Sequence, residues 1–283
     1  MFAHWSCEPS EVVPVVAITV LYWDRTRRLA ATREPVAWAR QASFYAGVLV
    51  GLVSLVSPID WLAEHRLLWV HMSQHLMLGD LAPLLVVLGL TGPVLAPLLA
   101  IGWLRRMLVL VHPLVALPLW IVNLYFWHLP VMYQAALAHS GVHALQHTCL
   151  AVAGGFMWAA VIEPLPGPAW FGHGYKALYT LIVRAAGMAL ATVFIWDGHI
   201  LYPHYKPLER LAGITPLTDQ RIAGLTMFIE GGIVTTGVFA VLFLRFAQDV
   251  EGRQRALEAE LDAQTVTRAA RYRRPARNRE VGR

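Results

Sequence analysis

Apolar residues in this chain occur in long runs separated by short polar segments, a pattern typical of membrane-spanning helices, which need about 20 mostly apolar residues. The runs predict seven spans, at residues 9–23, 40–58, 66–90, 108–128, 142–162, 176–197 and 221–246. The first is the weakest, because it contains Pro14 and ends at Asp24. A further apolar piece, Val94 to Trp103, is too short to span and predicts an interfacial or re-entrant helix. The predicted fold class is therefore an all-α polytopic membrane protein.

The composition supports this fold class and divides the chain in two. Hydrophobic residues make up 57% of the chain and charged residues only 14%, against about a quarter charged in soluble domains. Residues 1–247 form the predicted transmembrane domain. The last 16 residues contain seven Arg and one Glu, so we expect residues 248–283 to be a partly disordered cytoplasmic tail. Its arginines favour the anionic headgroups of the lipid bilayer, and no aromatic and basic surface for nucleic acid accompanies them.

The Lys and Arg residues indicate the orientation, because they accumulate in cytoplasmic loops. With the N-terminus outside, 18 of the 23 lie on the inner side, four on the outer side and one, Arg184, within a span. We therefore expect an outer N-terminus and a cytoplasmic C-terminus. Residues 1–8 lack the charged start of a cleavable signal peptide. The first helix is thus expected to be an uncleaved anchor in a bacterial inner (plasma) membrane.

Histidines gather on one side of the membrane in this orientation. Seven of the twelve lie in its outer half or just above it, namely His71, His75, His128, His143, His147, His199 and His204. Four of these form two copies of the pattern H-x-x-Q-H, near the starts of the third and fifth spans. Residues four apart share one face of a helix, and these two spans run in the same direction. Two such faces turned toward each other would make a four-histidine site.

Such a site predicts a transition metal, because neutral imidazole suits copper, zinc, iron and nickel. His128, at the outer end of the fourth span, is a candidate fifth ligand. Met72 would add a soft donor only if it turned to the same side as His71. A single histidine at a helix end more often anchors the helix at the interface, but two matched pairs inside spans favour a functional role.

Three charged residues lie inside predicted spans, where charges need partners. Asp80 and Arg184 fall at a similar depth in the inner half, which predicts an ion pair between them. Glu230 falls level with His75. At that depth it is a candidate supporting residue of the site, as a ligand or a proton acceptor, or else a neutral acid hydrogen-bonded within the bundle.

Other kinds of chemistry find little support in the sequence. There is no nucleophile–base arrangement, no glycine-rich phosphate loop and no pair of acid/base carboxylates, so we expect a protein that is not an enzyme. Cys7 and Cys149 form no CxxC motif and are expected to be unbridged. His4 and Cys7 form an H-x-x-C pair, and two ligands do not define a site.

Four motifs follow one another along the chain: His71-Met72-Ser73-Gln74-His75 leading to Ala82-Pro83-Leu84-Leu85; Trp127-His128-Leu129-Pro130 with Tyr133; His143-Ala144-Leu145-Gln146-His147; and Asp219-Gln220 with Ala223-Gly224 and Met227. In these motifs the chain resembles the CtaG family of polytopic bacterial assembly factors for caa-type cytochrome c oxidase, over about residues 40–245. The resemblance implies a seven-helix inner-membrane protein that handles copper for a haem–copper oxidase. It also makes Asp219 a candidate supporting residue. Phe228, where the family has Trp, and the Arg-rich tail depart from the pattern.

Three functions are open at this point. The first is an assembly factor that binds copper and works with oxidase subunits or copper chaperones. The second is a haem-binding electron-transfer protein with axial histidines from the third and fifth spans, which would need room for a flat macrocycle between them. The third is a metal transporter, which would need polar groups along the whole path; the inner half offers few besides Asp80 and Arg184.

Overall fold

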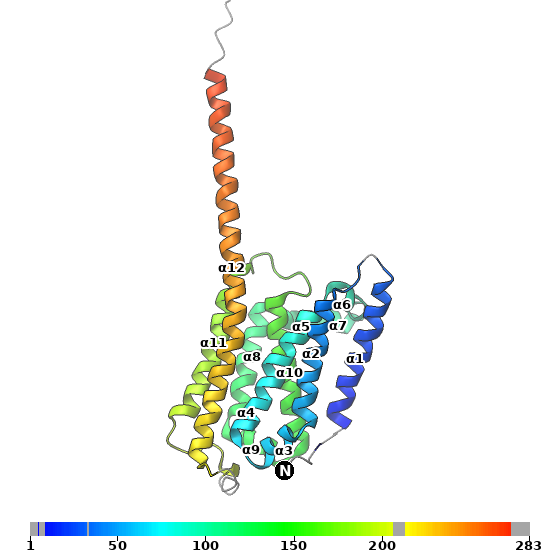
Figure 1. The fold of residues 1–283 in the computed structure, drawn as a ribbon, viewed down its shortest axis with the longest axis vertical. Helices are drawn as coiled ribbons and strands as arrows, with labels where there is room; N and C mark the ends of the chain where they lie inside the picture. Colours follow the sequence, from blue (N-terminus) through cyan, green and yellow to red (C-terminus); the bar gives the residue numbers. More distant parts are fainter. Residues whose placement is uncertain (1–4, 6–8, 33, 206–212, 273–283) are drawn as a thin grey trace, which may run out of the picture.

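The computed structural model describes residues 5, 9–32, 34–205 and 213–272. Within these ranges every regular element is a helix and no strand occurs, which confirms the predicted all-α fold class. Figure 1 shows the helices side by side in one bundle, with the last helix extending far beyond it. Five helices are long and apolar enough to cross a membrane: α2 (Trp38–Val56), the continuous α4–η1–α5 (Leu68–Gly89), α10 (Ser140–Ile162), α11 (His173–Trp196) and α12 (Pro216–Tyr272).

Two further helix pairs are apolar but bent, and the number of candidate spans rises to seven if each pair counts as one. The pair α6 (Gly92–Leu99) and α7–η2 (Gly102–Val111) bends by 118° and is a broken span or a re-entrant loop; the interfacial or re-entrant piece expected at Val94 to Trp103 lies within it and stays a prediction. The pair α8 (Pro113–His128) and α9 (Pro130–Ala138) bends by 69°. Both of these helices begin with proline, whose missing N–H costs nothing in the first turn.

Helix α1 (Pro9–Ala30) occupies the place of the first predicted span. It is not among the helices that pass as spans by length and composition, so its crossing of the membrane stays a prediction. It is attached to the bundle near its second half, where the Tyr22 hydroxyl donates to the Gly89 carbonyl at 3.0 Å and Arg25 donates to the Pro93 carbonyl at 2.8 Å. The Tyr22 ring also stacks on Phe44, with ring centroids 3.6 Å apart.

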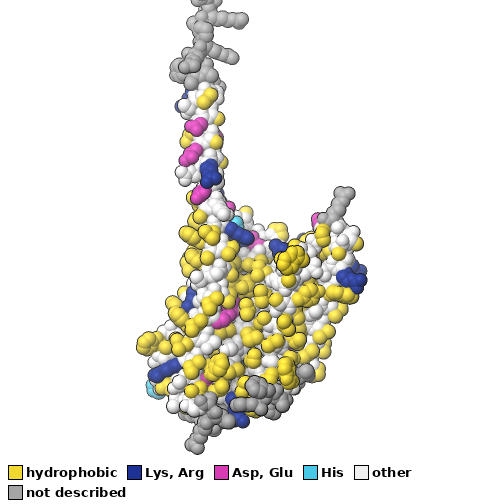
Figure 2. All heavy atoms as spheres, in the orientation of Figure 1, with side chains coloured by type: hydrophobic (Ala, Val, Ile, Leu, Met, Phe, Trp, Pro, Cys, Tyr) yellow, Lys and Arg dark blue, Asp and Glu magenta, His cyan; other side chains and the backbone are white. Residues whose placement is uncertain are grey.

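The start of α1 and the extension of α12 lie at opposite ends of the bundle (Figure 1), as an odd number of crossings requires. Which end faces outward stays a prediction. Residues 248–272, which we expected to belong to a partly disordered tail, are helical as the end of α12. Their helical pairs four residues apart explain the difference, for example Arg255 with Glu251 at 3.1 Å. Figure 2 shows charged side chains along this extension and mainly apolar ones over the bundle.

Two glycines let α4–η1–α5 and α10 approach closely. A Cβ atom at Gly154 would overlap the Gly79 carbonyl and lie 2.9 Å from its carbon, so a side chain there would force the two helices apart. Gly79 lies in η1 (Met77–Leu81), a π-helical turn within the third span. Such turns are frequent at functional sites, and this one directly follows the first histidine pair. The close approach places both H-x-x-Q-H segments on facing, parallel helices.

Candidate metal centre

The four predicted histidines form one buried group. A ring nitrogen from each of His71, His75, His143 and His147 can be chosen so that all four lie within 4.8 Å of one another. Their exposed fractions are between 0% and 5%. A tetrahedral ion with metal–nitrogen bonds of about 2.0–2.1 Å has nitrogens about 3.3 Å apart, so a small inward shift of the rings would complete such a site. The predicted pairing of the two motifs is confirmed as geometry; metal binding itself stays a prediction.

Hydrogen bonds hold two of these rings through Nδ1, so that Nε2 is the nitrogen turned to the other histidines; His71 Nε2 lies 2.9 Å from His75 Nε2. The Tyr205 hydroxyl, in η3 (Pro203–Tyr205), donates to the Ala63 carbonyl at 2.8 Å and lies 2.9 Å from His71 Nδ1. Its oxygen therefore accepts the Nδ1 proton, and His71 Nε2 keeps its lone pair. His143 Nδ1 lies 2.6 Å from Glu64 in the same way, so a neutral His143 carries its proton on Nδ1 and its lone pair on Nε2. An outer partner that fixes the tautomer of a ligating histidine is a usual feature of metal sites.

Several buried nitrogens of the group have no hydrogen-bond partner among the described residues. They are His75 Nδ1, His143 Nε2 and both ring nitrogens of His147. Buried polar atoms are nearly always paired, because an unpaired one costs about 1–3 kcal/mol. These unpaired nitrogens, in a group whose nitrogens lie within 4.8 Å of one another, make the four histidines a candidate metal site.

Two carboxylates behind the histidines of α10 were missed by the sequence reasoning. Glu64, near the end of α3 (Pro58–His65), bonds His143, and Glu11, in the first turn of α1, lies 3.5 Å from His147 Nδ1. The hydrogen bond from His143 lowers the pKa of the Glu64 carboxyl, against the opposing effect of burial, so Glu64 is ionised at neutral pH. The available signal was that both acidic residues lie near the outer ends of predicted spans.

The glutamines of the two motifs fix their helices and do not enter the metal group. Gln74 Nε2 donates to the Ser54 carbonyl at 3.0 Å and to Asp60 at 2.8 Å, which ties α4 to α2 and α3. Gln146 Nε2 lies 3.5 Å from the Trp127 carbonyl of α8. Both side chains are fully buried. The rotation of each helix about its axis, and so the direction of its histidines, depends on these contacts.

Asp219 supports the centre from a distance. Its side chain, 1% exposed in the first turn of α12, accepts the Leu68 amide at 2.7 Å and the Trp69 amide at 3.1 Å. These are the first amides of α4, which has no capping side chain of its own. A carboxylate there satisfies unpaired donors and interacts favourably with the helix dipole. Asp219 therefore positions His71 one turn further on, as a supporting residue that is outside the metal group.

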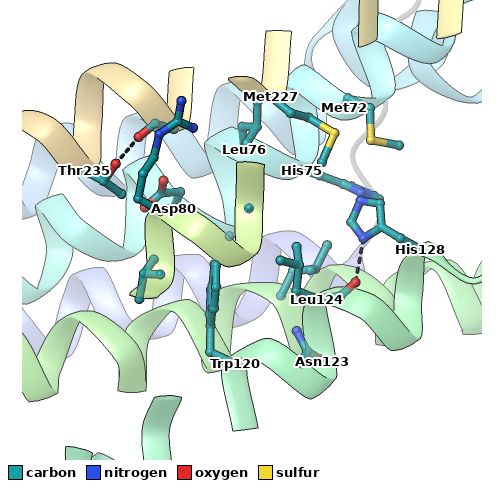
Figure 3. A pocket seen from close by; sticks show the side chains of 16 residues that line it. Met72, His75, Leu76, Asp80, Trp120, Asn123, Leu124, His128, Met227 and Thr235 are labelled. Carbon is teal, nitrogen blue, oxygen red and sulfur yellow. Dashed lines mark hydrogen bonds between the residues drawn. The ribbon is translucent and has the colours of Figure 1, made fainter. Parts of the chain in front are cut away.

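His128 lies beside the four-histidine group and outside it. Its ring centroid is 5.9 Å from that of His75, and the group of nitrogens within 4.8 Å does not include it. Its Nδ1 bonds the Leu124 carbonyl at 2.7 Å. With Met72, which is fully buried, it lines a separate cavity of about 70 Å³ next to the group (Figure 3). The role of fifth ligand is not supported by this geometry.

The predicted Asp80–Arg184 ion pair is wrong. Both residues line the same cavity, but Asp80 accepts a hydrogen bond from Trp158 Nε1 at 2.7 Å. The Arg184 guanidinium lies over the Phe228 ring, 4.6 Å from its centroid. The prediction rested on the similar depth of the two residues. Depth does not determine how each helix is rotated about its axis, and this rotation turns the two side chains to different partners.

Glu230 is also displaced from its predicted position level with His75. It interacts electrostatically with Asp80 and Arg184, and both of its buried carboxyl oxygens lack a partner among the described residues. The reason is that α12 begins at Pro216, five residues before the predicted start, which moves Glu230 about 7.5 Å deeper at 1.5 Å per residue. It is therefore not a ligand of the four-histidine group.

The remaining histidines at this end of the bundle stay apart from the centre. The His199 side chain is 96% exposed and paired with Asp197 at 3.0 Å, and His204 bonds the Glu64 carbonyl at 3.1 Å. Cys149 is a free thiol. His4 and Cys7 lie outside the described residues.

The comparisons with known proteins agree with the motifs. The model of the family described as cytochrome c oxidase caa3 assembly factor (Caa3_CtaG) matches residues 20–249, which covers all four histidines and Asp219. No curated protein and no solved structure matches the chain. Because the family model spans most of the chain, this protein belongs to the CtaG family of cytochrome c oxidase caa3 assembly factors.

Proposed function

We propose that this chain binds copper as its cargo at His71, His75, His143 and His147, and provides it to a haem–copper cytochrome c oxidase during assembly. The observation that carries the proposal is the buried group of imidazole nitrogens within 4.8 Å of one another, several of them unpaired. Membership of the assembly-factor family supplies the pathway. Imidazole nitrogen is a good ligand for copper, and membership in an oxidase-assembly family favours copper over the other metals that imidazole suits.

The charges around the group suit a membrane-embedded cation. Four neutral imidazoles carry no charge of their own, so anionic groups nearby stabilise a bound cation in an apolar bundle. Glu64, ionised and 2.6 Å from His143, supplies one, and the Glu11 carboxyl lies 3.5 Å from His147. Both come from the end of the bundle at which α1 begins (Figure 1). In the predicted orientation this is the outer side, where copper would arrive from a copper chaperone and leave for an oxidase subunit.

The haem alternative is disfavoured by the same geometry. Axial histidines bind haem iron from opposite faces of a wide macrocycle. The His71 and His75 Nε2 atoms are only 2.9 Å apart, and the His71 and His143 ring centroids are 5.3 Å apart. Rings in such contact leave no room for a macrocycle between α4 and α10.

Metal analysis combined with optical absorption tests the proposal. Full-length protein purified in detergent and loaded with Cu(I) should retain copper after desalting and show no Soret band. His71→Ala combined with His147→Ala should lose that copper, whereas the matched control His199→Ala, which removes an exposed histidine at the same end, should retain it. In cells, the double variant should lower oxidase activity at unchanged abundance of this protein.

Two results would contradict the proposal. Iron with a Soret band would assign the site to haem. Copper retention by the His71→Ala, His147→Ala variant equal to that of the control would show that the group is not the binding site.

A further inference from the structure

A small cavity adjoins the four-histidine group on the side away from Glu64 and Glu11. It has a volume of about 70 Å³ and is lined mainly by apolar residues of α4, α8, α11 and α12. A single water needs only about 10–15 Å³ of such volume, so an ion with a ligand shell fits. Figure 3 shows Met72, Met227, His75 and His128 together at one end of the cavity, and Asp80 and Thr235 at the other.

Three of the side chains at the first end offer lone pairs to the cavity. His128 is 7% exposed, and because its Nδ1 proton is donated to the Leu124 carbonyl at 2.7 Å, its Nε2 carries a lone pair. That Nε2 is buried and has no partner among the described residues. Met72 and Met227 belong to one apolar cluster, and in Figure 3 both thioether ends point to the region of the His75 and His128 rings.

We propose that Met72, Met227 and His128 form a second site that takes Cu(I), next to the four-histidine centre. Thioether sulfur is a soft donor that selects Cu(I), while imidazole binds copper in both oxidation states. The sequence offers Met72 as a possible soft donor only if it turns to the same side as His71. In the structure Met72 packs with Met227 of α12. This inference rests on the proposed function for the identity of the ion.

The charge of the surroundings favours a monovalent ion at this second site. The cost of moving an ion into an apolar medium grows with the square of its charge, and neutral ligands do not offset it. The two thioethers and the imidazole are neutral, and the carboxylate nearest along the cavity wall, Asp80, lies at its far end (Figure 3). The four-histidine centre, in contrast, has Glu64 and Glu11 behind it.

His75 connects the two sites. Its Nε2 lies 2.9 Å from His71 Nε2 within the centre, its Nδ1 has no partner among the described residues, and its ring centroid is 5.9 Å from that of His128. A Cu(I) ion can therefore exchange histidine for thioether ligands over a short step without changing its oxidation state. The second site would act as the exit position from which copper leaves for the oxidase.

Copper stoichiometry and X-ray absorption test the inference on the full chain. Protein loaded anaerobically with Cu(I), delivered as its acetonitrile complex, should bind about two ions and show copper–sulfur scattering. Met72→Leu combined with Met227→Leu should lose about one of the two ions and all of the sulfur scattering. Met188→Leu, on the exposed side of α11, is the matched control and should behave as the wild type. His71→Ala combined with His143→Ala should keep the sulfur scattering while losing the ion of the centre.

The outcomes separate this inference from the proposed function. One bound ion with only nitrogen neighbours in the wild type would refute the second site and leave the four-histidine proposal standing. Sulfur scattering that survives in the Met72→Leu, Met227→Leu variant would refute the assignment to these residues. No bound copper in the wild type would overturn both. Leucine has nearly the volume of methionine, so the variant should fold. If it does not fold, the presence or absence of copper–sulfur scattering in the wild type still tests the second site.

Discussion

Replacement of Glu64 by glutamine should weaken copper binding without removing any ligand. The change keeps the size of the side chain and its ability to accept the His143 Nδ1 proton, but it removes the negative charge. In the structure that charge is 2.6 Å from Nδ1, and a copper ion on Nε2 of the same ring would lie about 6 Å from the carboxylate, with a metal–nitrogen bond of about 2.0 Å.

Two contributions set the expected magnitude. A unit charge about 6 Å from a carboxylate interacts by about 2.8 kcal/mol at an effective dielectric constant near 20. Because the Glu64 side chain is 33% exposed, screening reduces this to roughly half. A charge-assisted hydrogen bond is about twice as strong as a neutral one, a difference of about 1 kcal/mol. The sum, about 2.4 kcal/mol, predicts a loss of roughly 30- to 100-fold in affinity, within the range known for outer-shell partners of metal ligands.

The assay is competition for Cu(I) between the purified protein and a chromophoric chelator. Glu64→Gln should transfer copper to the chelator at a 30- to 100-fold lower chelator concentration than the wild type does. Glu258→Gln is the matched control, because it removes the same charge from the exposed extension of α12, where Glu258 accepts a hydrogen bond from Gln254. Affinities of Glu64→Gln and Glu258→Gln that agree within twofold would refute the reasoning.

Three further predictions concern the support of the centre. Gly154→Ala should lower the free energy of unfolding by about 1–3 kcal/mol, because its Cβ meets the Gly79 carbonyl, and copper affinity should fall with it; an unchanged melting temperature would contradict the close approach. Asp219→Asn should cost about 1 kcal/mol by weakening the cap of α4, measured by thermal melting, and a variant as stable as the wild type would argue against the cap. Because the bond to His143 lowers the pKa of Glu64, the stability that this bond contributes is present above the ordinary glutamate pKa of 4.5 and is lost as the pH falls below it. The melting temperatures of the wild type and Glu64→Gln should therefore differ by a constant amount from pH 8 to 5 and converge in more acidic buffer.

The helical, membrane-spanning character and the pairing of the two histidine motifs were readable from the sequence. Hydrophobic runs of span length leave a helix as the simplest structure that satisfies every backbone polar group in lipid, and histidines four residues apart must share a helix face. Two parallel spans at similar depth then brought four imidazoles to one level. The sequence also indicated which predicted span was the least certain. The first predicted span has the lowest apolar content, and the corresponding helix α1 does not pass as a membrane span by length and composition.

The tertiary structure decided which side chains meet across helices. Depth along a span follows from counting residues, but the rotation of a helix and the start of its first turn depend on packing. For this reason Asp80 pairs with Trp158, and Glu230 lies deeper than counting predicted. Glu64 reaches His143 only because α3 folds back over the centre, and Met227 reaches Met72 only because α12 packs on α4. Contacts between residues far apart in the chain depend on packing energies summed over the whole bundle, and no local pattern of residues contains that sum.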